Sequence, residues 1–205
     1  MKSFWDQRYS EQGFVYGEEP NEYFRDYLDS GTQKPGRLLL PGEGEGRNAV
    51  YAAQKGWEVC AFDQSETGRD KALQLAANRG VQIQYDALDL RSYPFADNSF
   101  DLIGLFFFHL PTELRAFAHP WFVRALKPGG TLIAELFSKD QLGKASGGPQ
   151  SSDMLYDLES LASDFSELDI QYLAAGNTVL NEGKYHVGEA SVVRLIAKKE
   201  EERSL

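Results

Sequence analysis

The chain has 205 residues, 42% of them hydrophobic and 25% charged, which fits one globular domain and excludes a disordered chain. The formal net charge of −10 disfavours DNA or RNA as a partner, because nucleic-acid binders usually present a basic face. No apolar run approaches the roughly 20 residues that cross a bilayer, and one cysteine with three scattered histidines predicts no metal site. We therefore expect a cytoplasmic single domain over 1–205, a monomer or weak dimer, with no membrane or nucleic-acid partner.

Apolar runs alternate with helix-forming segments through the first two thirds of the chain. Runs bounded by Gly and Pro predict strands at 37–40, 57–62, 81–85, 101–107 and 131–137. Segments rich in helix formers, several of them ended by Gly, predict helices at 46–55, 67–79 and 112–126. This order predicts an α/β fold, a doubly wound and mostly parallel sheet with a core over 37–198. Such sheets bind ligands at the carboxyl ends of their strands.

The last third of the chain has a different pattern. Residues 139–152 are polar and rich in Gly and Ser, which predicts a mobile loop. A short helix at 155–163 is followed by strands at 168–175 and 190–198 with no helix between them. Two such strands predict an antiparallel pair at one edge of the sheet. The charged tail, 199–205, is expected to be frayed.

The first candidate binding element is the sequence Gly42-Glu43-Gly44-Glu45-Gly46 between a predicted strand and a predicted helix. Alternate glycines let the backbone turn tightly and approach a ligand, and the helix start supplies free N–H groups. The segment also matches the dinucleotide pattern G-x-G-x-x-G/A, so a nicotinamide cofactor remains an alternative. Two acidic side chains disfavour a pyrophosphate here and favour a cationic nucleoside such as S-adenosylmethionine.

Acidic residues follow the next two predicted strands. Asp63 ends the second strand, with Gln64 after it, and an acid at this place can accept hydrogen bonds from both ribose hydroxyls. Asp86 and Ala87 lie at the tip of the third strand, where a carboxylate and a backbone N–H can bind adenine. Asp89 is the second choice for that role, because it can equally cap the following turn.

These segments together resemble the class I S-adenosylmethionine-dependent methyltransferases, over about residues 4–198. The resemblance is carried by the series PGEGEGRNAVYAAQKGWEV, AFDQS, YDALDL, ADNSFDLIGLFFFHLP and LKPGGTLIAELF. The opening FWDQRY and the segment YGEEPNEYF are similar to the small branch that includes the tellurite-resistance and thiopurine methyltransferases.

The resemblance implies a seven-stranded sheet whose last strand is antiparallel, with S-adenosylmethionine as cofactor and S-adenosylhomocysteine as product. It also implies cofactor contacts at Gly42, Gly44, Gly46, Asp63 and the Asp86-Ala87 tip. One departure is Pro41, since many relatives have Asp or a small residue before the first glycine. We expect Glu43 to take over the contact with the ammonium group.

Methyl transfer needs alignment and exclusion of water, and a general base only for a protonated acceptor atom. His109 follows the fourth strand and is the first candidate base, with a structural role at least as probable on residue type alone. His186 is the second candidate, whereas His119 lies inside a helix and is expected to be structural. Phe108 is a candidate for lining the acceptor pocket, and Cys60 is expected to be core.

Aromatic residues are concentrated before the first strand, within 1–30. We expect Trp5, Tyr9 and Tyr16 to belong to a lid that closes over the cofactor, or alternatively to pack as ordinary core. The chain lacks the N/D-P-P-Y/F segment of DNA amino-methyltransferases, so the predicted acceptor is a small molecule. A protein side chain is the second choice for the acceptor. A non-catalytic S-adenosylmethionine-binding protein and a nicotinamide-dependent oxidoreductase are the alternative functions.

Overall fold

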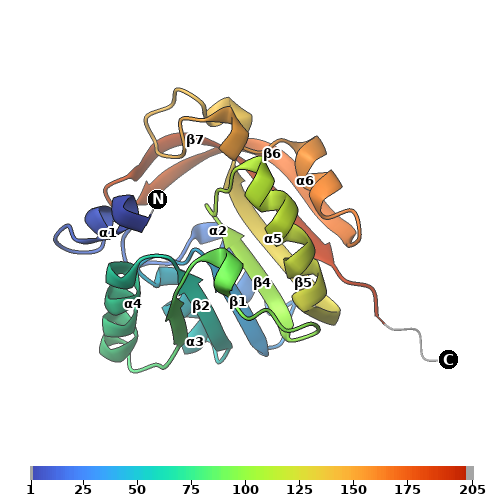
Figure 1. Ribbon diagram of the computed structural model, residues 1–205, viewed down its shortest axis with the longest axis horizontal. Coiled ribbons are helices and arrows are strands. Elements are labelled where there is room, and N and C mark those ends of the chain that lie inside the picture. The colour runs from blue at the N-terminus through green and yellow to red at the C-terminus, as the bar shows by residue number, and fades with distance from the viewer. Residues whose placement is uncertain (1, 202–205) are drawn as a thin grey trace. The chain divides into compact units, whose positions relative to one another are not determined.

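The computed structural model describes residues 2–201, which group into two compact units. The first unit takes in the described residues up to Tyr93 together with Asn181–Val187, and the second takes in Pro94–Leu180 and the described residues from Gly188 onward. Seven strands form one sheet in the order β3-β2-β1-β4-β5-β7-β6 (Figure 1). The predicted fold class is therefore confirmed, including its antiparallel edge.

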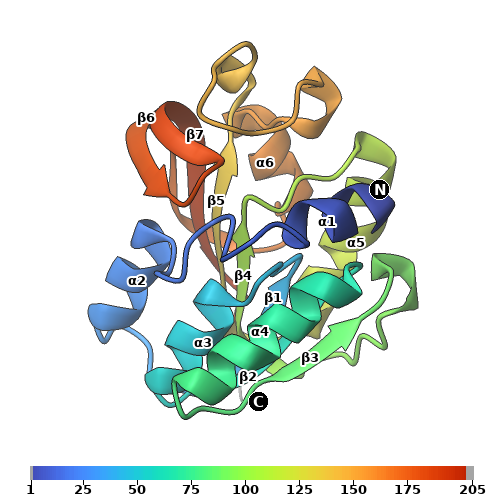
Figure 2. The ribbon, with the colours of Figure 1, turned by 90° about the vertical axis from the view of Figure 1, so that its left-hand side faces the viewer.

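The first unit contains a short parallel sheet with two helices packed on one of its faces. Its elements are α1 (Lys2–Tyr9), α2 (Glu22–Asp29), β1 (Arg37–Pro41), α3 (Arg47–Gln54), β2 (Glu58–Asp63), α4 (Glu66–Asn78), β3 (Gln84–Ala87) and the 3₁₀ turn η1 (Leu90–Ser92). The apolar run in β1 is completely buried, and α3 and α4 cover the strands (Figure 2). The parallel register sets Pro41 beside Phe62 and Asp63 beside Ala87. The carboxyl ends of these three strands therefore lie along one edge, where the sequence predicts the binding residues.

The second unit contains the remaining strands. Its elements are β4 (Phe100–Phe106), α5 (Thr112–Ala125), β5 (Leu126–Phe137), the 3₁₀ turns η2 (Lys139–Gln141) and η3 (Ser152–Met154), α6 (Leu158–Asp164), β6 (Asp169–Glu182) and β7 (His186–Lys198). β4 is parallel to β5, and β7 is antiparallel to β5. The tip of the β6–β7 hairpin, from Asn181 to Val187, belongs to the first unit.

Several boundaries differ from the sequence prediction: β5 begins at Leu126 and α6 at Leu158, and two further differences have physical reasons. The predicted strand 81–85 is found at Gln84–Ala87, because Val81 and Ile83 pack against Val50 and Leu75 before the ladder with β2 begins. The predicted connection 176–189 is mostly strand, since β6 and β7 form one long hairpin. Gly176 has no left-handed φ and lies within the strand.

Segment 139–152, predicted as a loop, contains the turn η2 and is hydrogen-bonded to β7. The Gln141 side chain accepts a hydrogen bond from the Ser191 N–H (2.8 Å) and donates one to the Ser146 hydroxyl (2.9 Å). The Ser146 hydroxyl in turn donates to the Glu189 carbonyl (2.6 Å). A high Gly and Ser content therefore coexists with a hydrogen-bonded conformation.

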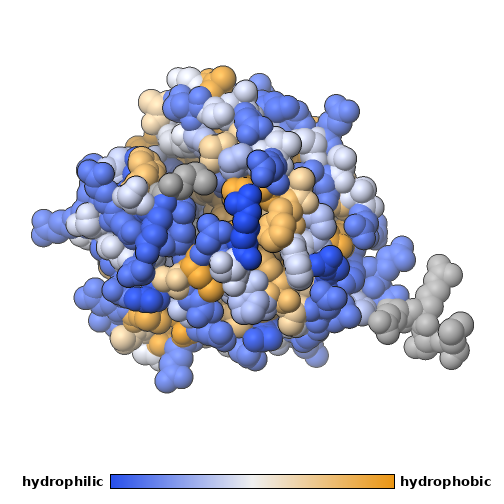
Figure 3. Space-filling view, viewed as in Figure 1, coloured by the Kyte–Doolittle hydropathy of each residue, from blue (hydrophilic) through white to orange (hydrophobic). Residues whose placement is uncertain are grey.

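The helices and the acidic, His and Cys side chains of the described residues bear on the predictions about a membrane and a metal. On the face shown in Figure 3, hydrophilic residues predominate and apolar residues form small groups. Between residues 2 and 201, no helix is long and apolar enough to cross a membrane. The same residues contain no cluster of three or more His, Cys, Asp or Glu side chains that could hold a metal ion. The predicted charged tail lies mostly outside the described residues, which end at Glu201.

Candidate functional site

The glycine loop between β1 and α3 adopts a backbone conformation that requires glycine. Gly42, Gly44 and Gly46 have φ values of +62°, +62° and +89°. A Cβ on Gly44 would lie 2.5 Å from the Tyr9 hydroxyl, and one on Gly46 would lie 2.5 Å from the Cβ of Ala72. The loop is thus held closely between α1 and α4, and a side chain at these glycines would force its neighbours apart.

Glu43 is buried inside this loop and ties it to the start of α3. Its carboxylate accepts hydrogen bonds from the Ala49 N–H (2.7 Å) and the Asn48 side chain (3.3 Å). Burial raises the pKa of Glu43 to about 7, although these hydrogen bonds and the charge of Arg47 act in the opposite direction. A cation beside this carboxylate would stabilise its ionised form.

Glu45, the second acid of the loop, has a different role. Its carboxylate accepts a hydrogen bond from the Val15 N–H (2.8 Å) and forms an ion pair with Lys71 (2.8 Å). It also lies 3.4 Å from the Tyr16 N–H. From sequence we expected the negative charge of Glu45 to favour a cationic ligand, but Lys71 already neutralises this charge. Glu45 holds the N-terminal segment against the loop.

Asp63, at the end of β2, holds the same loop from its other side. Its carboxylate accepts hydrogen bonds from the N–H groups of Ser65 (2.9 Å) and Gly44 (3.2 Å). Burial raises the pKa of Asp63 to about 6, against the effect of these hydrogen bonds. Each carboxylate oxygen can accept a further hydrogen bond, so a vicinal diol fits this position chemically. Gln64, next in the chain, is half-buried.

The tip of β3 lies beside Asp63. Asp86 and Ala87 are half-buried, and Ala87 is in register with Asp63. Asp89 accepts a hydrogen bond from the Arg91 N–H (2.9 Å) and caps η1. Asp89 therefore caps the turn, which is one of its two predicted roles, and the adenine contact of Asp86 remains a prediction.

The N-terminal aromatic residues pack against the glycine loop. Tyr9 is buried and stacks on Trp5, with ring centroids 5.4 Å apart. The Asp6 carboxylate accepts a hydrogen bond from the Ser65 hydroxyl (2.6 Å), which fixes α1 to the start of α4. The centroid of the Tyr16 ring lies 6.4 Å from that of Trp5 and 6.4 Å from that of Tyr9. The three residues predicted as a lid therefore lie together, and Tyr9 contacts the loop at Gly44; their closing over a cofactor remains a prediction.

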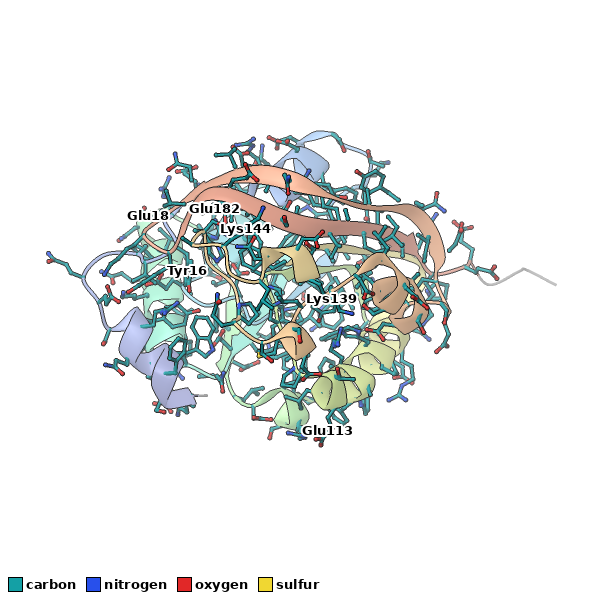
Figure 4. The ribbon with its side chains drawn as sticks, turned by 90° about the horizontal axis from the view of Figure 1, so that it is seen from above. Tyr16, Glu18, Glu113, Lys139, Lys144 and Glu182 are labelled. Atoms are coloured by element: carbon teal, nitrogen blue, oxygen red, sulfur yellow. The ribbon has the colours of Figure 1, made fainter. Side chains whose placement is uncertain are left out.

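The hairpin tip adds a buried polar group that the sequence does not reveal. Glu182 pairs with Arg47 (2.8 Å) and lies 3.2 Å from Nδ1 of His186, whose ring is 4.6 Å from that of Tyr16. Figure 4 shows Tyr16 and Glu182 in the same region of the first unit. Burial raises the pKa of Glu182, but Arg47 and His186 outweigh it and lower the value to about 2. Burial also lowers the pKa of His186, so its imidazole is neutral at physiological pH.

The second unit contains the other two predicted site residues. His109 Nδ1 lies 2.9 Å from the Met154 carbonyl, and Nε2 accepts a hydrogen bond from the Phe137 N–H (3.3 Å). Both ring nitrogens thus contact backbone groups, and a role as general base remains a prediction. Phe108 is half-buried with its edge toward Phe122. His119 is buried and pairs with Asp164 (2.9 Å), in agreement with a structural role.

Comparison with known proteins shows what this chain is similar to. Residues 39–130 match the family described as a methyltransferase domain. The chain is 31% identical over 117 residues to a 2-heptyl-1-hydroxyquinolin-4(1H)-one methyltransferase of Mycobacteroides abscessus, covering 56% of this chain and 52% of the relative. The chain spans about half the length of the curated relatives it matches.

Solved structures share the fold. One, from work entitled "Conversion of a Disulfide Bond into a Thioacetal Group during Echinomycin Biosynthesis", has a TM-score of 0.77 at 17% identity, covering 100% of this chain and 94% of the other. TehB from Haemophilus influenzae has a TM-score of 0.70 at 15% identity, covering 97% of this chain and 67% of the other. These comparisons agree with the predicted resemblance to class I methyltransferases, and the assignment to one branch remains a prediction.

Proposed function

We propose that this chain is a class I methyltransferase, which binds S-adenosylmethionine and transfers its methyl group to a small molecule. The observation that carries the proposal is the pair of buried carboxylates, Glu43 and Asp63, which hold the glycine loop from both sides. Burial raises the pKa of both side chains, and a cationic nucleoside with a free diol would offset that burial.

Different residues of the proposed site bind different parts of the cofactor. Asp63 accepts hydrogen bonds from the ribose hydroxyls, Gln64 flanks it, and Asp86 with the Ala87 backbone contacts adenine. Glu43 faces the ammonium group, while Gly42, Gly44 and Gly46 allow close approach of the backbone. The cofactor supplies a methyl group on a positively charged sulfur, which is already an activated leaving group. The residues of this chain align the donor, and the segment with Trp5, Tyr9 and Tyr16 excludes water.

A small-molecule acceptor is supported by the relative from Mycobacteroides abscessus, which is named for a hydroxyquinolone acceptor. A protein side chain remains the second candidate acceptor. His109 and His186 remain candidate bases, and Phe108 a candidate for the acceptor pocket. The cytoplasmic location, a monomeric or weakly dimeric state, and the lack of nucleic-acid, membrane and metal partners also remain predictions.

Calorimetric titration with S-adenosylhomocysteine tests the proposal directly. We expect micromolar binding or better, on the order of −8 kcal/mol. We expect a parallel titration with NADH to give no heat. Binding of NADH would instead favour the alternative function, a nicotinamide-dependent oxidoreductase. Absence of binding at millimolar S-adenosylhomocysteine would refute the cofactor assignment. Binding without turnover on any acceptor would leave a non-catalytic binding protein.

A further inference from the structure

Arg8 occupies an unusual environment in the first unit. Its guanidinium carbon lies 4.1 Å from the centroid of the Tyr185 ring and 4.6 Å from that of Phe4. Its Nη1 donates a hydrogen bond to the Tyr16 hydroxyl (3.0 Å). Arg8 is half-buried, because these rings cover part of it. The guanidinium is thus fixed in position by aromatic faces and by one hydroxyl.

Within residues 2–201, Arg8 forms no ion pair, although acidic residues outnumber basic ones by 31 to 21 in the whole chain. Three other cations of the first unit are paired: Arg47 with Glu182, Lys71 with Glu45, and Lys184 with Glu11. Glu11 also accepts a hydrogen bond from the Tyr185 hydroxyl, so its carboxylate is already used. A guanidinium has five N–H donors, and Arg8 uses one of them in a hydrogen bond to the described residues.

The surroundings of Arg8 suit a flat ring. The centroid of the Tyr16 ring lies 6.4 Å from that of Trp5 and 6.0 Å from that of Tyr185. All three residues are half-buried. We call Trp5, Arg8, Tyr16 and Tyr185 the arginine–aromatic group. It adjoins the glycine loop through Tyr9, which stacks on Trp5 and contacts Gly44. Aromatic faces stack on planar rings, and a guanidinium donates charge-assisted hydrogen bonds to an oxyanion.

We propose that the arginine–aromatic group is the acceptor site, and that the acceptor is a flat aromatic molecule whose acidic hydroxyl binds Arg8 as an oxyanion. This inference rests on the proposed methyltransferase function. The ionised oxygen uses an electron pair to form the new O–CH₃ bond. The C–S bond of the donor breaks, and sulfur keeps that electron pair as a neutral thioether. The hydroxyl proton has already passed to solvent, because Arg8 favours the ionised acceptor.

The test is calorimetric binding of two matched probes to the S-adenosylhomocysteine complex, which cannot react. The probes are 1-hydroxyquinolin-4(1H)-one and quinolin-4(1H)-one, which differ in the acidic hydroxyl. We expect wild-type protein to bind the hydroxylated probe about 10- to 100-fold more tightly, the range for a charge-assisted hydrogen bond. Arg8→Met keeps the apolar stem against Phe4 and Tyr185 and should remove this preference. Arg8→Lys should retain part of it.

Arg69→Met is the matched control, because Arg69 lies on α4 in the same unit and pairs with Asp70. It should leave both probe affinities unchanged. Equal affinity of wild-type protein for the two probes would overturn the proposal, as would an unchanged preference in Arg8→Met. If Arg8→Met instead weakens S-adenosylhomocysteine, Arg8 binds the carboxylate of the cofactor and the acceptor assignment is wrong. Failure of S-adenosylhomocysteine to bind wild-type protein refutes the proposed function itself, so the two failures are distinguishable.

Discussion

Among single residues, Asp63 offers the most direct test of the cofactor site. Replacing Asp63 by Ala removes the acceptor for two ribose hydroxyls, so we expect S-adenosylhomocysteine to bind about 1–3 kcal/mol more weakly. Circular dichroism should show that the variant is folded, and calorimetry then gives the affinity. Unchanged affinity in a folded Asp63→Ala protein would show that the ribose lies elsewhere.

The same carboxylate makes stability depend on pH. In the folded chain Asp63 keeps its proton up to about pH 6, whereas in the unfolded chain it loses the proton near its ordinary pKa of 3.8. Between these values the folded state binds more protons, so the free energy of unfolding falls as pH rises. A shift of this size corresponds to about 3 kcal/mol. Glu43, with a pKa of about 7, acts with the same sign.

We therefore expect Asp63→Asn to flatten the decline in stability between pH 4 and pH 7. Urea unfolding of the wild type and the variant at both pH values measures the difference. Asp70→Asn, on the exposed side of α4, is the control and should follow the wild type. An identical decline in wild type and Asp63→Asn would mean that Asp63 is not the source. Glu182 acts at lower pH with the opposite sign, since its lowered pKa gives stability that is lost as pH falls below about 4.

The sequence reveals a residue's role where the role depends on neighbours that are close along the chain. Gly42, Gly44 and Gly46 stand out because only glycine takes their left-handed φ, and Asp63 because it ends a buried strand. Glu45 was misjudged because its partners, Val15 and Lys71, are 30 and 26 residues away. Glu182 could not be found, since its partner Arg47 is 135 residues away along the chain.

At the level of elements, periodicity and Gly/Pro punctuation located the helices and strands of the sheet core. The exceptions have specific causes. The third strand was placed too early because Val81 and Ile83 are apolar but pack on helices. The hairpin was broken at 176–189 because Gly and Asn suggest turns, although only Gly183 there lies at the turn with a left-handed φ next to Val15 and Gly17. Pattern alone does not show which glycine the turn uses.

The helix α1 is the element whose movement we expect to matter. Tyr9 rests on Gly44, and Asp6 is bound to Ser65, so α1 lies against the glycine loop. If α1 is a lid, S-adenosylhomocysteine should slow amide exchange across residues 2–16 while β1 and β2 change little. Hydrogen–deuterium exchange with and without ligand measures this. Equal exchange in α1 under both conditions would identify α1 as permanently packed core.

For the whole molecule, the match to a methyltransferase domain covers 39–130, and the arginine–aromatic group lies outside it, whereas the acceptor-pocket candidate Phe108 lies inside. Trp5, Arg8 and Tyr16 precede the match, while Tyr185 and His186 follow it. If the two proposals hold, most of the proposed cofactor contacts lie within the matched residues, and the arginine–aromatic group adds acceptor contacts from the flanking segments.

The discontinuous first unit has a consequence for how this protein is made. Its N-terminal segment contacts a hairpin tip that emerges from the ribosome far later, since Glu11 and Tyr185 are 174 residues apart. Until that tip is synthesised, Arg47 has no Glu182 to neutralise it, and the backbone around Val15 and Gly17 lacks Gly183. Contacts between residues so distant in sequence are slow to form, because the chain must close a long loop first. The N-terminal half of the nascent chain therefore stays incompletely packed until the hairpin tip has been synthesised.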